Sequence, residues 1–521
     1  MILYKSTRGE DKLYSFSAVI LKGIAEDGGL FVPKKIRQFS LDQLKLLVNK
    51  SYQERALFIL DLFQTDFPRS LLKKIIYEVY SNNFSHPKIA PLKKLRNNLY
   101  ILELWHGPTS AFKDIALQLM PKFFCEALQW ENQIRIKKGK LPLQYLILVA
   151  TSGDTGKAAL EGYKNLEGIS IIVVYPDKGV SGLQELHMTT QVGKNLAVYG
   201  MEGNFDDVQG IIKEIFNDQK FNKMLLEKGN IILSSANSIN WGRLVPQIVY
   251  HVSSYLDLVS REVINIGEEI DIAVPTGNFG NILAAFYAQK MGLPVRKLIC
   301  ASNQNNMLSE FLQTGIYDVN KRILTKTPSP SMDIIIAANI ERLVYEITRD
   351  SEKVSQWMRQ LKDKNKFTVD EKTKLFLQKT FYADWVSNDK CLTMIKKTYK
   401  ETGCLIDPHT AVAQAVVNRY RQKKQENTPI VICSTAHWAK FAKDVYKALA
   451  GLNYNDFRLN RFDEFEILSK MSNLVPKASI PQSILELKNR KVRHFGKCRA
   501  DKKEVEKIIS SVMKREACRF S

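Results

Sequence analysis

Between residues 100 and 310, short and almost continuously apolar runs alternate with longer stretches of helical spacing. Six of the apolar runs predict strands, at Gln144–Ala150, Ile169–Tyr175, Asn195–Tyr199, Asn230–Ser234, Asp271–Val274 and Lys297–Ala301. The helices between them are predicted to begin near Gly156, Gly182, Asp206, Ile239 and Asn281. This alternation favours an α/β fold whose mostly parallel strands are covered by helices on both faces.

The first 90 residues follow a different pattern. Residues 1–90 are predicted to be a mainly helical N-terminal region, because apolar residues recur at helical spacing in 41–48 and 57–67. Ser40 and Gln43 fit a capping box at the start of the first of these helices.

The rest of the chain is predicted to hold one main region and a tail. Residues 91–445 would form two α/β subdomains, of which the smaller spans about 144–205. Within the main region, 341–401 is predicted to be helical and rich in lysine, and Pro429–Cys433 to be one more buried strand. Residues 446–521 are basic and partly amphipathic, and are predicted to form a C-terminal appendage.

The composition is that of a globular protein with an excess of positive charge. Of the 521 residues, 45% are apolar and 25% are charged, which excludes a chain that is disordered throughout or collagen-like. The 76 basic and 54 acidic residues give a net charge of +22, which favours anionic ligands. A basic nucleic-acid-binding protein is the rival interpretation. We do not favour it, because the sequence has neither a recognisable module nor a basic stripe interleaved with aromatic residues.

No part of the sequence predicts a membrane span, a metal site or secretion. No apolar run approaches the roughly 18–20 residues that cross a bilayer, and charges at Lys5, Arg8 and Glu10 interrupt the N-terminus. The seven cysteines are scattered and include no Cys-x-x-Cys pair, so neither a zinc site nor a disulfide framework is predicted. We therefore expect a chain of the reducing cytoplasm.

Three loops that follow predicted strands carry candidate chemistry, because ligands of open α/β sheets bind beyond the carboxyl ends of strands. Thr151–Gly156 suits a carboxylate or phosphate, although a simple capped helix start explains it equally well. Pro275–Asn281 matches neither dinucleotide nor P-loop spacing, and predicts either an anion-binding loop or a tight turn. Ser434–His437 is more typical of a helix cap.

Lys113 is a further candidate. It stands between Phe112 and the apolar stretch Ile115–Met120, so its side chain is a candidate for burial. Burial lowers the pKa of a lysine amine and makes it nucleophilic. Spacing alone does not distinguish Lys113 from the many surface lysines.

Nine motifs occur in a fixed order: YKSTRG at 4–9, GIAEDGGLFVP at 23–33, HGPTSAFKD at 106–114, ATSGDTG at 150–156, NSINWGR at 237–243, PTGNFGN at 275–281, PSMDI at 330–334, DPHTAVA at 407–413 and STAHWAKF at 434–441. Together they resemble the threonine synthase family over residues 4–441. The resemblance implies the tryptophan-synthase-β-like fold of pyridoxal-phosphate enzymes, fold type II. It also implies two open, mostly parallel sheets flanked by helices, with 91–445 as the cofactor-binding catalytic region.

The resemblance also implies a reaction and a cofactor. The family converts O-phospho-L-homoserine and water into L-threonine and phosphate, the last step of threonine biosynthesis. Pyridoxal 5′-phosphate would be held by Lys113 as an aldimine, and the freed amine would then act as a positioned base. A related phospho-lyase that acts on the same substrate without forming threonine is the alternative. The intact Lys113 and the 277–281 loop argue against a non-catalytic member of the family.

The remaining site residues are implied in the same way. Those implied to bind the cofactor are Lys113, Gly277, Asn278, Phe279, Asn281, Thr435 and Asp154. Those implied to bind the substrate are Ser152, Gly153, Thr155 and Arg243. Backbone donors of the 277–281 loop would hold the cofactor phosphate, Thr435 its pyridine nitrogen, and Ser152–Thr155 the substrate carboxylate. Arg243 would bind the substrate phosphate, although a structural ion pair explains it equally well.

Two expectations complete the prediction. The histidines within the motifs, His106, His409 and His437, are expected to be structural hydrogen-bonding residues rather than general bases. The protein is expected to act on a small molecule as a monomer or homodimer, without nucleic acid, membrane or metal.

Overall fold

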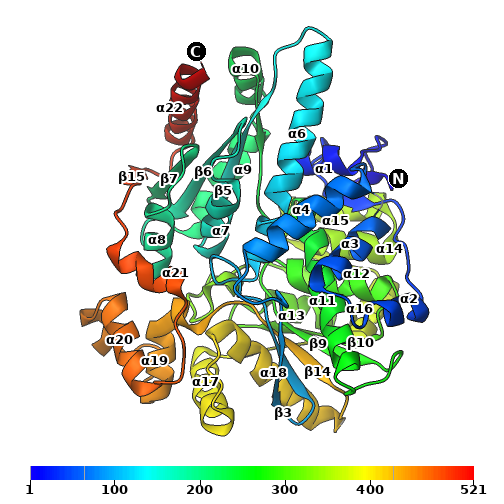
Figure 1. Cartoon of the computed structure of the whole chain (residues 1–521), viewed down its shortest axis with the longest axis vertical. Coiled ribbons are helices and arrows are strands. Elements are labelled where there is room, and N and C mark those ends of the chain that lie inside the picture. The colour runs from blue at the N-terminus through cyan, green and yellow to red at the C-terminus, as the bar shows by residue number, and fades with distance from the viewer. Residues whose placement is uncertain (1, 64, 426, 521) are drawn as a thin grey trace.

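Two open sheets organise the chain and lie one above the other in Figure 1. The computed structural model describes residues 2–63, 65–425 and 427–520, with side chains for all of these except Asp206 and 514–520. Within these ranges, no helix combines the length and the apolar character that a membrane span needs. The same residues contain no group of three or more His, Cys, Asp or Glu side chains that could hold a metal ion.

The larger sheet has six strands in the order β13-β10-β9-β14-β4-β3. They are β3 (Leu92–Arg96), β4 (Leu99–Glu103), β9 (Ile270–Pro275), β10 (Val295–Ser302), β13 (Phe381–Trp385) and β14 (Ile430–Ser434). All neighbours are parallel except β3 and β4. Ile272 and Val274 pack toward α11 (Trp241–Ser260) and α12 (Gly280–Lys290), whereas Ala273 packs toward α18 (Pro408–Lys424). Both faces are therefore buried.

The smaller sheet has five parallel strands in the order β15-β7-β6-β5-β8. They are β5 (Gln144–Ala150), β6 (Ile169–Pro176), β7 (Leu196–Met201), β8 (Ile231–Ser234) and β15 (Gly496–Cys498). Ile147 and Val149 pack toward α7 (Asp154–Tyr163), and Leu146 and Leu148 pack toward α9 (Phe205–Asn217) and α22 (Lys502–Phe520). The sheet extends beyond the predicted range of 144–205, because β8 and β15 also belong to it.

The predicted α/β fold with two mostly parallel, doubly covered sheets is confirmed. Each of the seven predicted strands exists, with ends within two residues of the prediction. The five helix starts predicted between them are also correct to within two residues, including α8 (Gly182–Thr189).

The described residues of the N-terminal region form four helices and one short antiparallel pair of strands. The strands are β1 (Tyr4–Ser6) and β2 (Phe31–Pro33), and the helices are α1 (Phe16–Lys22), α2 (Leu41–Leu47), α3 (Tyr52–Leu62) and α4 (Arg69–Asn82). The capping box of Ser40 and Gln43 forms at the start of α2. Helix α3 begins before the apolar repeat noted at 57–67, because a second capping box, of Ser51 and Glu54, starts it at Tyr52.

The stretch 341–401 is mostly helical, as predicted, but two strands that the sequence analysis did not predict interrupt it. Its elements are α14 (Ile340–Thr348), α15 (Ser351–Lys364), β12 (Lys366–Thr368), α16 (Glu371–Thr380), β13 and α17 (Asn388–Thr402). β12 pairs with β11 (Ile316–Asp318), which follows α13 (Met307–Thr314), and β13 is the outer strand of the larger sheet. The strand partners are distant in sequence, so local lysine content and helical spacing did not reveal them.

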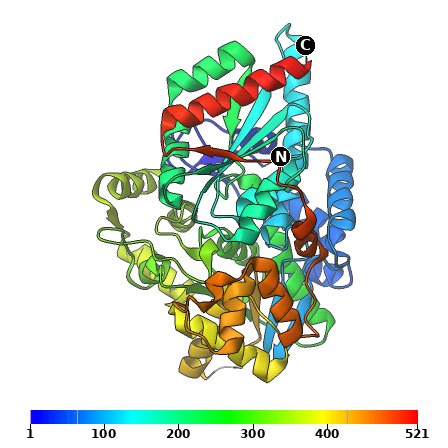
Figure 2. The same ribbon diagram turned by 90° about the vertical axis from the view of Figure 1, so that its left-hand side faces the viewer.

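The C-terminal segment packs on both sheets. Its elements are α19 (Ala442–Ala450), α20 (Glu464–Leu474), α21 (Gln482–Leu485), β15 and α22. Ile467 and Met471 of α20 join the core beneath the larger sheet. β15 then pairs with β7, and Val505 and Ile509 of α22 pack over the smaller sheet. Figure 2 shows α22, in red, crossing that sheet close to α10 (Gln219–Gly229) and α9.

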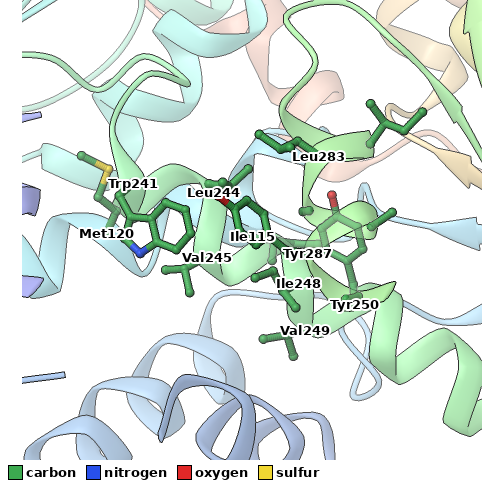
Figure 3. Close-up of a cluster of buried hydrophobic side chains, with 14 of the residues drawn as sticks. Ile115, Met120, Trp241, Leu244, Val245, Ile248, Val249, Tyr250, Leu283 and Tyr287 are labelled. Carbon is green, nitrogen blue, oxygen red and sulfur yellow. The ribbon is translucent and has the colours of Figure 1, made fainter. Parts of the chain in front are cut away.

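Helix α11 lies at the centre of the largest hydrophobic cluster. Its residues Trp241, Leu244 and Ile248 pack among Ile115 and Tyr287 (Figure 3). Nearly every residue of α11 is buried. A helix fixed in this way presents its few polar side chains in constant positions.

Candidate active site

The three loops singled out in the sequence meet around one cavity of about 380 Å³. The loop after β5 contributes Thr151, Ser152 and Thr155, the loop after β9 contributes 275–281, and the loop after β14 contributes Thr435. The cavity therefore has one wall from each sheet. We call 275–281 with Thr435 the larger-sheet wall, and 151–155 with α9 the smaller-sheet wall.

Lys113 begins α5 (Lys113–Leu117) and reaches the cavity from within the protein. Only 9% of it is exposed. Its Nζ lies 3.4 Å from Oδ2 of Asp154 and 3.4 Å from Oγ of Ser331. Burial lowers the pKa of Lys113, and the charges of Lys440 and Arg243 lower it further, against the opposing effect of Asp154. Lys113 is thus a buried amine and not a surface charge.

The start of α5 is fixed by Asp114 and by the loop after β14. Thr109 donates to Asp114 through its backbone N–H at 2.9 Å and through Oγ1 at 2.6 Å. Burial raises the pKa of Asp114 to about 6. The N–H of Phe112 donates to the carbonyl of Thr435 at 2.8 Å. These contacts fix the position of Lys113 relative to the larger-sheet wall.

Asp154 lies behind the cavity wall, where it is almost fully buried. Its Oδ1 is 2.7 Å from Nζ of Lys440 and accepts from Nε2 of Gln184 at 3.2 Å. Its Oδ2 accepts from Oγ of Ser331 at 3.2 Å and faces Lys113. Burial alone would raise the pKa of Asp154, but the charges of Lys440 and Lys113 outweigh it and hold that pKa well below its usual range.

Gly153, like Asp154, does not line the cavity. Its φ of +126° is accessible to glycine, and an added Cβ would lie 2.5 Å from the side chain of Gln184. Gly153 was predicted to bind the substrate. Because it has no side chain, it leaves room for Gln184 to donate a hydrogen bond to Asp154.

The larger-sheet wall presents a row of unpaired donors. No hydrogen bond to another described residue engages the backbone N–H of Gly277, Asn278, Phe279 or Asn281. The side-chain Nδ2 of Asn281 is also buried without a partner. Unpaired amides at the N-terminus of a helix, here α12, are the usual setting for a bound phosphate. Of the two predictions for this loop, the geometry favours the anion-binding loop over a merely tight turn.

The same loop is rigidly held. Phe279 adopts the left-handed conformation, with φ of +60°. Oδ1 of Asn278 accepts from the N–H of Ala338 at 2.6 Å, and its Nδ2 donates to Ser238 at 2.9 Å. A Cβ added to Gly277 would lie 2.3 Å from the carbonyl oxygen of Ser331. The loop is therefore fixed by its neighbours from both sides.

In the smaller-sheet wall, the loop Thr151–Gly156 has the features both of a helix cap and of an anion-binding loop. Oγ1 of Thr151 accepts from the N–H of Gly153 at 3.0 Å and of Gly156 at 2.9 Å, as a cap does. The N–H groups of Ser152 and Thr155 have no hydrogen-bond partner among the residues that the structure describes. The loop thus caps α7 and still presents donors to the cavity.

Arg243, in the first turn of α11, is a buried cation that lines the cavity. It donates from Nη1 to the carbonyl of Ala236, and its Nε is buried without a partner. Burial lowers its pKa to about 10, so it stays charged at neutral pH. No described carboxylate lies within ion-pair distance of Arg243, so the structural ion pair is not found there.

The three motif histidines are hydrogen-bonded. Nδ1 of His409 faces Oδ1 of Asp407 at 2.7 Å, and its Nε2 accepts from the N–H of Ser331 at 3.2 Å. His437 caps η2 (Trp438–Phe441), and burial lowers its pKa to about 3. Nε2 of His106 lies 3.0 Å from Glu103. These contacts agree with structural roles, although His409 also lines the cavity.

Several cavity residues were not singled out from the sequence. Ser331 in η1 (Pro330–Met332) and Ser238 fall within quoted motifs, so the motifs themselves offered a signal. Gln209 and Lys213 of α9 line the smaller-sheet wall without belonging to any motif. Only the amphipathic spacing of α9 indicated that one of its faces is covered.

Comparison with known proteins identifies the family. Three family models match consecutive parts of the chain: threonine synthase N terminus at 3–80, pyridoxal-phosphate dependent enzyme at 81–378, and threonine synthase, C-terminal, at 410–509. Threonine synthase of Saccharomyces cerevisiae is 37% identical over 500 residues, which cover 91% of this chain and 94% of that protein. The chain belongs to the threonine synthase family.

Solved structures agree with this membership. The pyridoxal-phosphate-bound threonine synthase of Brucella melitensis is 34% identical, with a TM-score of 0.83 over 98% of this chain and 100% of that one. The yeast enzyme is 34% identical, with a TM-score of 0.85 over 98% and 99%. Human threonine synthase-like 1 is 40% identical over 510 residues, or 95% of this chain. The chain spans about two thirds (66%) of the length of that relative.

Pyridoxal phosphate is the cofactor of this family, and the residues present fit it. The unpaired amides of 277–281 and the orphaned Nδ2 of Asn281 suit its phosphate. The hydroxyl of Thr435 faces the cavity without a hydrogen bond to any described residue. Lys113 is a buried amine, which is the group that binds the cofactor's carbonyl carbon in such enzymes.

Proposed function

We propose that the chain converts O-phospho-L-homoserine and water into L-threonine and phosphate, the last step of threonine biosynthesis. The observation that carries this proposal is that one cavity holds a buried lysine, two sets of unpaired backbone donors and an arginine without a carboxylate. One set of donors suits the cofactor phosphate and the other the substrate carboxylate, which leaves Arg243 for the substrate phosphate.

The cofactor would be held by the larger-sheet wall. Gly277, Asn278, Phe279 and Asn281 would donate to its phosphate, and Thr435 would hydrogen-bond its pyridine nitrogen. When bound, pyridoxal phosphate supplies an electron sink for the negative charge that develops at the substrate's α carbon. The hydroxyl of Thr435, unlike a carboxylate, would leave that nitrogen unprotonated and so would moderate the sink.

Residues of this chain would carry out the remaining steps. Ser152 and Thr155 would orient the substrate carboxylate through their backbone N–H groups. Nζ of Lys113, once free of the cofactor, would remove the proton from the α carbon. Loss of a proton from the β carbon would expel the phosphate from the γ carbon, and the guanidinium of Arg243 would bind that phosphate and stabilise its charge. A proton would then be added at the γ carbon, and water would add its hydroxyl to the β carbon while a proton returns to the α carbon.

The test is the visible absorbance of the purified protein with added pyridoxal phosphate, followed by product analysis. The wild type should show the band of a lysine-bound cofactor, lost on borohydride reduction. Lys113→Ala should lack it and lose activity about 10⁴-fold or more. Lys138→Ala, at an exposed lysine, is the matched control. Absence of the band from the wild type would overturn the proposal.

Product analysis separates two activities. Addition of O-phosphohomoserine should release threonine and phosphate in equal amounts. Phosphate release without threonine would instead identify a related phospho-lyase acting on the same substrate.

We also propose that the protein is cytoplasmic and acts as a monomer or homodimer. Six cysteines, Cys125, Cys300, Cys391, Cys404, Cys433 and Cys498, have free thiols, which supports a reducing compartment. Cell fractionation and light scattering test these two statements, and an oxidised, secreted or higher-order form would contradict them.

A further inference from the structure

Lys440 is a second buried lysine beside the site, and the proposed reaction gives it no role. It lies in η2, directly after the loop that carries Thr435, and is only 2% exposed. Its Nζ donates to the carbonyl of Thr109 at 2.9 Å and lies 2.7 Å from Oδ1 of Asp154. A buried ammonium is costly unless it is paired, so Asp154 and Lys440 stabilise each other.

Asp154 is shared between two lysines in an asymmetric way. Lys440 is 2.7 Å from one carboxylate oxygen, whereas Lys113 is 3.4 Å from the other. Ser331 also donates to that second oxygen, at 3.2 Å. One negative charge thus serves two amines, and the closer partner is the lysine that does not line the cavity.

We propose that Lys440 is a positioning residue: by pairing with Asp154, it leaves the amine of Lys113 without a counter-charge of its own, and so keeps that amine available as nucleophile and base. The same ion pair ties the start of α7, on the smaller-sheet wall, to the loop after β14 on the larger-sheet wall. The catalytic meaning of this inference rests on the proposed function, whereas the charge arrangement belongs to the chain itself.

The charges around Lys113 determine how its pKa should change when the charge of Lys440 is removed: it should rise. Lys113 faces one carboxylate, Asp154, and two cations, Lys440 and Arg243. His409 lies near Asp154, and Asp114 lies near Lys440. If Lys440 loses its charge, Asp154 is left to pair with Lys113. An opposite charge at this distance raises the pKa of an amine by about one to three units.

The experiment measures the protonation of Lys113 directly on the full-length chain before cofactor is added. Acetic anhydride labels only neutral amines, and mass spectrometry of the Lys113 peptide gives the extent of labelling at each pH. In Lys440→Met, the midpoint for labelling Lys113 should rise by about one pH unit or more. In Lys440→Arg, which keeps the charge, the midpoint should stay close to that of the wild type.

A double variant separates the electrostatic role from a merely structural one. Asp154→Asn combined with Lys440→Met replaces the buried ion pair by two neutral side chains, and serves also if Lys440→Met alone fails to fold. Lys113 then has no carboxylate to pair with, so its labelling midpoint should lie at or below that of the wild type. An unchanged midpoint in the folded Lys440→Met variant, or a raised one in the double variant, would overturn the inference.

The loaded enzyme gives a second readout. The acidic limb of the kcat profile should move to higher pH in Lys440→Met and return in Lys440→Arg. Because labelling of Lys113 does not depend on which product forms, a failure of the proposed function would leave the labelling result intact. A failure of the present inference would leave threonine formation intact.

Discussion

The two walls of the cavity are held in place by different means. The larger-sheet wall continues into α12, whose residues from Asn281 to Ala288 are all buried, and Asn278 is fixed by hydrogen bonds on both sides of its amide. On the smaller-sheet wall, by contrast, the described side chains of α9 are mostly exposed or partly buried, and only Val208, Ile212 and Ile215 are buried. Its contacts with the opposite wall are concentrated in the polar group around Asp154.

This difference separates two tasks. The wall that would hold the cofactor is fixed by close packing, which leaves no room for an added side-chain atom at Gly277. The wall that would recognise the substrate carboxylate is placed by a few hydrogen bonds and ion pairs, and its own donors are backbone groups. Substitutions should therefore be far more damaging on the larger-sheet wall.

The strongest test of this contrast is Gly277→Ala. The added Cβ would lie 2.3 Å from the carbonyl oxygen of Ser331, a backbone atom that cannot turn away. Such overpacking costs about 1–3 kcal/mol, so the cofactor should bind about 10- to 100-fold more weakly. Gly280→Ala is the matched control, because its nearest neighbouring atom is 3.8 Å away, and it should bind the cofactor normally. Titration of the visible band with pyridoxal phosphate measures both, and equal affinities would contradict the idea of a rigid wall.

Arg243→Met removes the buried cation that faces the cavity from α11. A hydrogen bond to a charged group contributes about 1.5–3 kcal/mol, so the KM for O-phosphohomoserine should rise about 10- to 100-fold. Inhibition by inorganic phosphate should weaken in parallel, and Arg243→Lys should lie between the two. Steady-state kinetics provide the measurement, and an unchanged KM would remove Arg243 from the phosphate site.

The pH dependence of stability tests the buried polar support of the larger-sheet wall. Nε2 of His251 donates to the carbonyl of Asn281 at 3.1 Å, and burial lowers the pKa of His251 to about 3. The unfolded chain therefore binds a proton below about pH 6.5 that the folded chain does not. This residue should lower the free energy of unfolding by up to about 1.4 kcal/mol for each unit that pH falls from 6.5 toward 3.

His251→Gln keeps a donor but cannot take up that proton. Its urea unfolding midpoint should depend less on pH between 7 and 5 than that of the wild type. If the unfolding midpoints of the two proteins change equally with pH, His251 is not the source of this pH dependence.

The smallest effects are expected on the smaller-sheet wall. Ser152→Ala and Thr155→Val remove hydroxyl groups but leave the unpaired backbone donors of the loop in place. Loss of a neutral hydrogen bond costs about 0.5–1.5 kcal/mol, so kcat/KM should fall only about two- to tenfold. A loss as large as that of Gly277→Ala would mean that both walls are equally intolerant, and the contrast between them would fail.

Much of the fold and the position of the site were predictable because both follow from local pattern. Buried strands appear as apolar runs, and the loops after β5, β9 and β14 mark the edge where ligands bind. The glycine at 277 and the hydroxyl at 435 could be named from sequence, since the motif order identified their family.

What escaped prediction depends on contacts between distant residues. β13 becomes a strand by pairing with β10, and β15 by pairing with β7, so neither follows from its own sequence. The burial of Lys113 and its contacts with Asp154 and Ser331 arise only when the fold brings these distant residues together. Lys440 was within a quoted motif, yet its role depends on a carboxylate that precedes it by more than half the chain.

The pairing of β14 with β4 has a consequence for biosynthesis. Ile430 lies opposite Leu99, 331 positions earlier, and the smaller sheet is formed largely by the residues between them. While the protein is being made, β4 can pair with β3 at once, but more than three hundred further residues must leave the ribosome before it can pair with β14. A nascent chain released before residue 430 lacks a central strand of the larger sheet and exposes its apolar edges, which makes truncated products natural clients of chaperones and proteases.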